Sequence, residues 1–82
     1  MALRILITGA SSGIGKITAE HLANLGHQVY GTSRNPDKQQ SDRIHFLALD
    51  LTDEDSIKQL VKSYFDIEDK LDVLVNNAGI GI

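Results

Sequence analysis

Short apolar runs recur along the chain, and within each run few polar residues interrupt the hydrophobic ones. This pattern is typical of strands that are buried on both faces of a sheet. The runs occupy residues 2–8, 29–32, 44–49 and 71–75. We therefore predict a strand in each run. The turn residues at 34–37 leave room for at most a turn or two of helix between the second strand and the third.

Two longer segments carry apolar residues at the spacing of an amphipathic helix. We predict the first helix over residues 13–25, with Gly26 as the left-handed residue that ends it. Its expected buried stripe is Ile14, Ile17, Leu22 and Leu25. The second helix follows Thr52, its expected N-cap, and Asp55 stands at the capping-box position of an acidic first turn. Its expected stripe is Ile57, Leu60, Val61, Tyr64 and Phe65.

The alternation of strands and helices predicts an α/β fold in which right-handed crossovers build a parallel sheet. We expect one domain over residues 1–82, a Rossmann-type sheet of strand order 3-2-1-4. Such a sheet is the truncated half of a doubly wound domain, with its switch point between the first and fourth strands. Ligands bind at the carboxyl ends of the strands at a switch point. Polar or glycine-rich segments stand at those ends, at residues 8–15, 33–34, 50–51 and 76–79.

Composition narrows the class of protein. The 82 residues suffice for one small domain, and 41% apolar with 23% charged residues is typical of a globular chain. A net charge of −3 argues against nucleic-acid and membrane-surface partners. The absence of cysteine excludes disulfides and thiolate metal sites. The apolar start is too short for a signal peptide or a membrane span, so we expect a cytoplasmic protein.

The histidines and the acidic run offer no metal site. His21, His27 and His45 are scattered over a helix, a loop and a strand, and no pair has the spacing of metal ligands. The acidic residues 53–55 are explained by the positive end of the helix that they open. We therefore predict no bound metal.

The glycine-rich segment after the first strand is typical of a phosphate-binding loop. A pyrophosphate must approach backbone N–H groups at a helix N-terminus, where side chains would obstruct it. Gly9 permits the tight turn, Gly13 allows close approach, and Gly15 lets the helix pack on the sheet. Ser11 and Ser12 can add hydroxyl hydrogen bonds to phosphate or ribose. The alternative is a flexible turn without a ligand; a Walker-type loop is excluded because no Gly-Lys-Ser/Thr follows.

The end of the second strand indicates which dinucleotide is preferred. An acidic residue there binds the ribose 2′-hydroxyl of NAD, whereas an arginine accommodates the 2′-phosphate of NADP. Here the position is occupied by Ser33 and Arg34, and no acid follows until Asp37. A guanidinium can bind the 2′-phosphate bidentately. The sequence therefore favours NADP over NAD, the alternative being a surface arginine in a turn.

These motifs resemble those of the short-chain dehydrogenase/reductase family. The chain has its Thr-Gly-x-x-x-Gly-Ile-Gly spacing, its Asn-Asn-Ala-Gly signature at 76–79, and an aspartate, Asp50, after the third strand. The resemblance spans Arg4 through Gly81 and implies roles for individual residues. Contacts to the pyrophosphate and the adenosine ribose are implied for Gly9, Ser11, Ser12, Ile14 and Gly15. Adenine would be held by Asp50 and Leu51. The path to the nicotinamide ribose would be lined by Asn77, Ala78 and Gly79, and Asn76 would tie the central strands together.

The chain departs from the family in its catalytic residues. The family's chemistry needs a Tyr-x-x-x-Lys pair and a serine beyond the Asn-Asn-Ala-Gly signature. Here Tyr30 is followed by Arg34 and Tyr64 by Glu68, so we expect no catalytic residue. We interpret the chain as a fragment, the NADP(H)-binding part of an oxidoreductase that transfers hydride to or from alcohol and carbonyl groups.

Two alternatives stay open: a nucleotide-binding module without catalysis, natural or engineered, and a chain that folds only in association. The fourth strand would form an exposed apolar edge in the sheet of this chain. We therefore expect self-association, or docking with a missing C-terminal half. The end of the second helix, with Asp66, Glu68, Asp69 and Lys70, is interpreted as solvated.

Overall fold

The computed structural model describes residues 2–11, 13–38 and 41–77. Its elements are β1 (Arg4–Ile7), α1 (Gly13–Asn24), β2 (Gln28–Ser33), the 3-10 turn η1 (Pro36–Lys38), β3 (Ile44–Ala48), α2 (Glu54–Ile67) and β4 (Val73–Val75). Every predicted strand and helix is present. Both ends of β1, the end of β3 and the start of β4 fall short of the apolar runs that predicted them.

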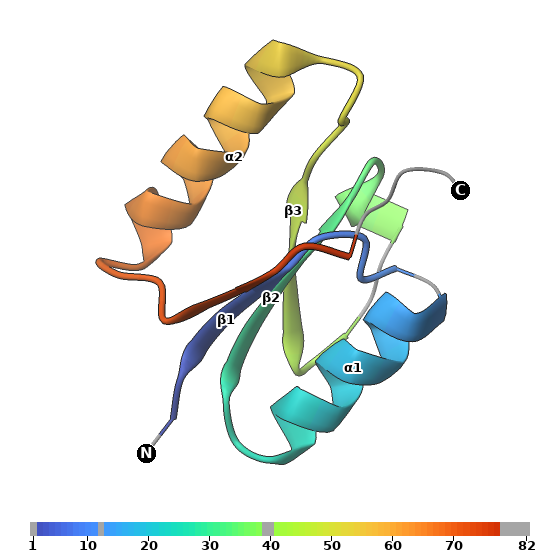
Figure 1. Cartoon of the computed structure of the whole chain (residues 1–82), viewed down its shortest axis with the longest axis vertical. Coiled ribbons are helices and arrows are strands. Elements are labelled where there is room, and N and C mark those ends of the chain that lie inside the picture. Colours follow the sequence, from blue (N-terminus) through green and yellow to red (C-terminus); the bar gives the residue numbers. More distant parts are fainter. Residues whose placement is uncertain (1, 12, 39–40, 78–82) are drawn as a thin grey trace.

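The four strands form one parallel sheet of order β3-β2-β1-β4, as predicted. α1 covers one face of the sheet and α2 covers the other (Figure 1). Alternate side chains of β1 point to opposite faces of the sheet. Ile5 and Ile7 pack with Ala19 of α1, and Leu6 packs with Leu60 of α2. Neither helix of the described residues has the length and apolarity that crossing a bilayer requires.

The buried face of α1 differs from the predicted stripe. Ile14 is 76% exposed and Ile17 is 68% exposed, and Leu25 is exposed as well. Leu22 of the predicted stripe is partly buried and packs against the core, as expected, but the buried residues of the helix are the small Gly15 and Ala19. The helix axis lies so close to the β1 turn that a larger side chain would not fit between them, and hydrophobicity alone did not reveal this.

The start of α2 also corrects the prediction. The N-cap is Asp53, whose carboxylate accepts from the Asp55 amide at 2.9 Å, so Asp55 does not complete a capping box with Thr52. Thr52 instead donates from its amide and its hydroxyl to Asp50 Oδ1, at 3.0 and 2.6 Å. Both residues are good N-caps by type. Because the Thr52 hydroxyl is hydrogen-bonded to Asp50, it does not cap the helix, and Asp53 is the N-cap instead.

The α2 side of the sheet stays open beside β4. Leu60 and Tyr64 of the predicted stripe are buried, whereas Val61 and Phe65 are about half exposed, at 52% and 51%. Leu74 of β4 is 58% exposed, and a cavity of about 260 Å³ lies between this strand and the helix. An apolar surface of this kind on a small domain usually meets another polypeptide.

Candidate nucleotide-binding site

The carboxyl ends of β1, β2 and β3 surround a cavity of about 330 Å³. It is lined by Gly9, Ser11, Thr32, Ser33, Arg34, Leu49, Asp50, Leu51 and Thr52. Three segments that the sequence singled out, after the first, second and third strands, thus meet at one place. The remaining lining residues Thr32, Leu49 and Thr52 were not predicted as site residues, although each neighbours one that was.

The glycine turn after β1 is fixed against β2. Gly9 has φ 71°, and its amide donates to the hydroxyl of Thr32 at 2.9 Å. The next amide, of Ala10, donates to the Thr32 carbonyl at 3.2 Å. Thr32 is 2% exposed, so the hydrogen bond that its hydroxyl accepts from Gly9 is shielded from solvent. The turn and the strand that leads to Arg34 are therefore joined directly.

The start of α1 offers unobstructed backbone. Gly13 has φ 62°, a left-handed conformation that favours glycine, and apart from the adjoining residues and the backbone of the helix itself no described atom lies within 4 Å of where its Cβ would be. The first turn of the helix holds no acidic residue, so no carboxylate of that turn opposes an anion at the positive end of its dipole. Ile14 follows with its side chain in solvent. This end of the helix fits a phosphate group.

Gly15 secures the packing beneath the turn. A Cβ at this position would lie 2.2 Å from the Gly9 carbonyl oxygen and 2.5 Å from Asn77 Nδ2. The predicted role of this glycine in close packing is therefore supported by the geometry. The close approach brings α1, the glycine turn and the end of β4 together at one point.

The charged residues of the cavity are Arg34 and Asp50. The hydroxyl and the amide of Thr52 hydrogen-bond the Asp50 carboxylate and hold its pKa below the ordinary value, and the charge of Arg34 lowers it further. The Asp50 amide donates to Ser56 Oγ at 2.8 Å, which anchors the loop on α2. Asp50 therefore presents an ionised acceptor, and Arg34, which is exposed, presents a cation at the same opening.

The end of β4 joins the site through Thr8. The Asn77 amide donates to Thr8 Oγ1 at 2.9 Å, and Asn77 Nδ2 donates to the Gly9 carbonyl at 3.3 Å. The Thr8 hydroxyl lies 3.2 Å from Asn76 Oδ1 and 3.4 Å from the Val75 carbonyl. These contacts fit the tie between central strands that the resemblance implies for Asn76. The role of Thr8 was missed, because its partners lie far along the chain.

Three predicted site residues, Ser12, Ala78 and Gly79, lie outside the described residues. Ser11, Gly13, Ile14 and Gly15 lie at the turn and the start of α1, as expected.

The two tyrosines are structural. Tyr30 and Tyr64 are 5% and 1% exposed, and their rings pack edge to face at 5.1 Å. The Tyr30 hydroxyl donates to Glu68, and the Tyr64 hydroxyl donates to the Lys70 carbonyl at 2.8 Å. Burial and the bond to Glu68 raise the pKa of Tyr30 to about 12, which opposes any role in proton transfer near neutral pH.

The described residues contain no group of three or more side chains placed to bind a metal. His27 has a structural contact instead, since its Nδ1 accepts from the Leu3 amide at 3.0 Å. Glu54 and Asp55 lie in the first turn of α2, as the sequence indicated, whereas Asp53 is the N-cap in place of Thr52.

Comparison with known proteins decides the family. The profile of the short chain dehydrogenase family matches residues 4–82. The chain belongs to this family. It is 50% identical over 78 residues to a 3-ketodihydrosphingosine reductase of Bacteroides thetaiotaomicron, covering 95% of this chain and 29% of that protein. It is 36% identical over 88 residues to a serine 3-dehydrogenase of Agrobacterium fabrum, covering 100% of this chain and 35% of the relative.

Solved structures of short-chain dehydrogenases share the fold. A short-chain dehydrogenase from Streptomyces avermitilis matches with a TM-score of 0.84 at 36% identity, over 96% of this chain and 31% of that one. ElxO with NADP bound matches with a TM-score of 0.79 at 35% identity, over 100% of this chain and 37% of its own. The chain thus spans about a third of the length of these family members.

Proposed function

We propose that the chain binds NADP(H) at the carboxyl edge of its sheet, as the nucleotide-binding part of an oxidoreductase that transfers hydride to or from alcohol or carbonyl groups. The observation that carries the NADP assignment is Arg34. It lines the same opening as the glycine turn and Asp50, and no acidic residue accompanies it at the end of β2. NADP and NADPH are bound in the related ElxO structures.

Under this proposal each part of the cavity receives one part of the cofactor. The 2′-phosphate meets Ser33 and Arg34, and adenine lies against Asp50 and Leu51. The pyrophosphate lies over the glycine turn and the start of α1, where backbone amides and the helix dipole favour it. The path from there to the nicotinamide ribose passes Asn77. When bound, the cofactor would donate the hydride as NADPH or accept it as NADP⁺, whereas this chain's residues bind and orient it.

Calorimetric titration with NADPH and with NADH tests the proposal. We expect NADPH to bind about tenfold or more tightly, because a charge-assisted hydrogen bond contributes about 1.5–3 kcal/mol. Arg34→Ala should abolish the preference. Arg43→Ala is the matched control, since Arg43 is exposed and does not line this cavity, and it should change neither affinity. Equal affinity of the native chain for both dinucleotides would refute the NADP assignment.

We also propose that the open side of β4 receives another polypeptide, either a second copy of the chain or the C-terminal half of a longer enzyme. The apolar cavity beside α2 and the exposed Leu74 support this. The catalytic groups of the parent enzyme would then lie beyond these residues. The cytoplasmic location expected from the sequence stays a prediction.

A further inference from the structure

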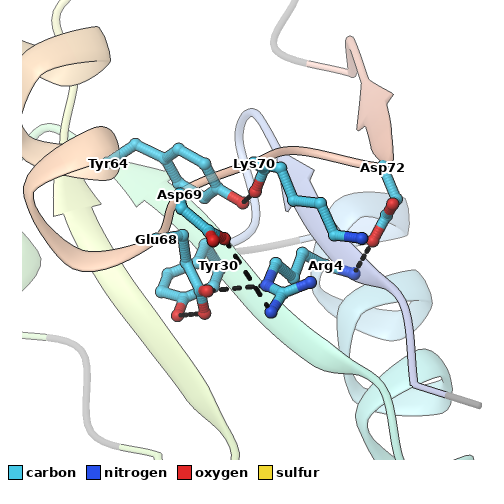
Figure 2. Close-up of polar contacts among 7 residues, drawn as sticks. All are labelled: Arg4, Tyr30, Tyr64, Glu68, Asp69, Lys70 and Asp72. Atoms are coloured by element: carbon cyan, nitrogen blue, oxygen red, sulfur yellow. Dashed lines mark hydrogen bonds and ion pairs between the residues drawn. The ribbon is translucent and has the colours of Figure 1, made fainter.

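One carboxylate at the amino end of the sheet joins three elements, at the opposite end from the nucleotide site. Glu68 ends α2, and its amide donates to the Tyr64 carbonyl at 2.9 Å. Its side chain is only 16% exposed and turns back over the sheet (Figure 2). Oε1 accepts from Arg4 Nε of β1 at 2.7 Å, and Oε2 accepts from the Tyr30 hydroxyl of β2. The interpretation of this helix end as solvated was therefore wrong for Glu68.

Arg4 extends the same network to β4. Its amide donates to Asp72 Oδ2 at 2.8 Å, and its carbonyl accepts from the Asp72 amide at 3.0 Å. The chain between α2 and β4 is further held by the bond from the Tyr64 hydroxyl to the Lys70 carbonyl. The segment that leads into β4 is therefore bonded to β1, to α2 and, through Glu68, to β2.

β4 needs such contacts, because little else determines its register. It is three residues long, Val73–Val75, and in the described part of the chain it pairs with β1 alone. A slip of one residue would turn each side chain to the other face of the sheet. Such a slip is normally opposed by the alternation of apolar and polar residues. The Val-Leu-Val sequence is apolar on both faces and opposes it weakly.

A change of register at the amino end of β4 would also displace the residues at its carboxyl end. Asp72 and Asn77 are five residues apart, or about 17 Å of extended chain. Asn77 reaches Thr8 Oγ1 and the Gly9 carbonyl only in the observed register, in which Ile5 faces Val73. The ladder between β1 and β4 is thus bounded by polar contacts at both ends and has apolar residues between them.

We propose that Arg4, Tyr30, Glu68 and Asp72 form a register lock for β4, and that this lock positions Asn77 in the nucleotide site. The second clause rests on the proposed function, whereas the first does not. These are positioning residues: none lines the cavity, and they act through the pairing of β4 with β1.

Hydrogen exchange of the ligand-free chain tests the lock by itself. Glu68→Gln removes the charge and one of the two acceptor oxygens. We expect the amides of Thr8 and Asn77 to exchange about tenfold faster, while the Leu49 amide, bonded between β3 and β2, keeps its rate. Asp69→Asn is the matched control. Asp69 also faces Arg4, but its side chain is 87% exposed and its carboxylate is as far as 4.0 Å from the guanidinium, so its loss should change none of these rates.

If Glu68→Gln does not fold, Arg4→Lys provides the same test, since lysine keeps the charge but loses the Nε donor. Equal acceleration of all three amides would mean that the cluster only stabilises the whole fold and would overturn the lock. Unchanged exchange at Thr8 and Asn77 would overturn it as well.

Ligand binding tests the positioning clause. Adenosine 2′,5′-bisphosphate would occupy the proposed Arg34 and Asp50 side of the cavity and reach the glycine turn with its 5′-phosphate, whereas NADP⁺ would also extend toward Asn77. Glu68→Gln should weaken NADP⁺ about tenfold and leave the bisphosphate within about twofold. In an Asn77→Ala background, the same substitution should have no further effect. Equal weakening of both ligands, or additive losses, overturns the positioning clause. If the native chain binds neither ligand, the proposed function fails, and the exchange experiment still decides the lock.

Discussion

The amide of Gly9 donates a hydrogen bond of 2.9 Å to the hydroxyl of Thr32, which is almost completely buried. This contact joins the glycine turn after β1 to the strand that ends at Ser33, next to Arg34. The two parts proposed to bind pyrophosphate and 2′-phosphate are therefore held at a fixed distance before any ligand binds. Preorganisation of this kind strengthens binding because less ordering remains to be done on association.

Replacing Thr32 by valine should weaken both stability and binding. Valine keeps the shape of the side chain but leaves the Gly9 amide without its partner, at a cost of about 1–3 kcal/mol. Urea unfolding should show this loss, and NADPH affinity should fall because the turn is no longer fixed. Thr18→Val, at a half-buried position of α1 outside the cavity, should change the affinity little. Full affinity in Thr32→Val would show that the turn is fixed by other contacts.

Gly15→Ala should be destabilising, although alanine is normally the better helix residue by about 0.5–1 kcal/mol. The new methyl group would lie 2.2 Å from the Gly9 carbonyl oxygen, a backbone atom that cannot rotate away. We expect a loss of at least the 1–3 kcal/mol typical of overpacked cores. Thermal unfolding measures it, with Ile17→Ala as an exposed control that should stay within about 0.5 kcal/mol. A stabilised Gly15→Ala would mean that α1 lies farther from the turn.

The sequence predicted the elements and their order because both depend on local patterns. Apolar runs and helical spacing mark the strands and helices, and the handedness of crossovers then determines the strand order. The prediction of the buried face of α1 missed Gly15 and Ala19, because these residues are buried for their small size and the spacing of hydrophobic residues does not indicate such positions. Thr52 and Asp53 are equally good caps by type, and only the contact with Asp50 decides between them.

Most of the candidate site was predictable, since glycines, Arg34 and Asp50 carry their chemistry in their residue types. Thr32 and Glu68 were not, because their importance comes from distant partners. Thr32 bonds a residue 23 positions away, and Glu68 bonds residues 38 and 64 positions away. The spacing of residue types within a short segment of the sequence does not indicate such contacts.

Stability should depend on pH through Glu68 and Tyr30. The hydrogen bond from Tyr30, then that from Arg4, holds the pKa of Glu68 below its ordinary value of 4.5. A lowered carboxylate pKa stabilises the fold above the unfolded value, and this contribution is lost as pH falls through the folded one. For Tyr30, burial and then Glu68 raise the pKa from 10.0 to about 12. Its contribution is complete below pH 10 and is lost as pH rises toward 12.

Urea midpoints measured across this range check both limbs. Glu68→Gln should flatten the acid limb relative to the native chain, leaving the part that arises from Asp50, whose pKa is also lowered. Tyr30→Phe should reduce the alkaline loss, leaving a part due to Tyr64, whose pKa burial also raises. An acid limb that is identical in the native chain and in Glu68→Gln would contradict the assigned role of this carboxylate.

The isolated chain should self-associate through the open side of β4. Val73 and Leu74 are 36% and 58% exposed on a strand whose outer edge has no partner in the described residues. They adjoin the apolar cavity formed with α2. An apolar strand edge without lysine or proline is a template for pairing with another chain. Sedimentation velocity at increasing concentration should therefore show species larger than the monomer.

A charge on this edge should prevent that association. Leu74→Lys places an ammonium on the apolar face of this edge strand, beside the cavity, and we expect it to sediment as a monomer. Ile17→Lys is the matched control, because Ile17 is 68% exposed on α1, which covers the opposite face of the sheet, and it should associate like the native chain. If the native chain stays monomeric at high micromolar concentration and unfolds cooperatively, β4 is stable as an edge. The polar contacts of Arg4, Glu68 and Asp72 would then be sufficient to hold it without a second strand.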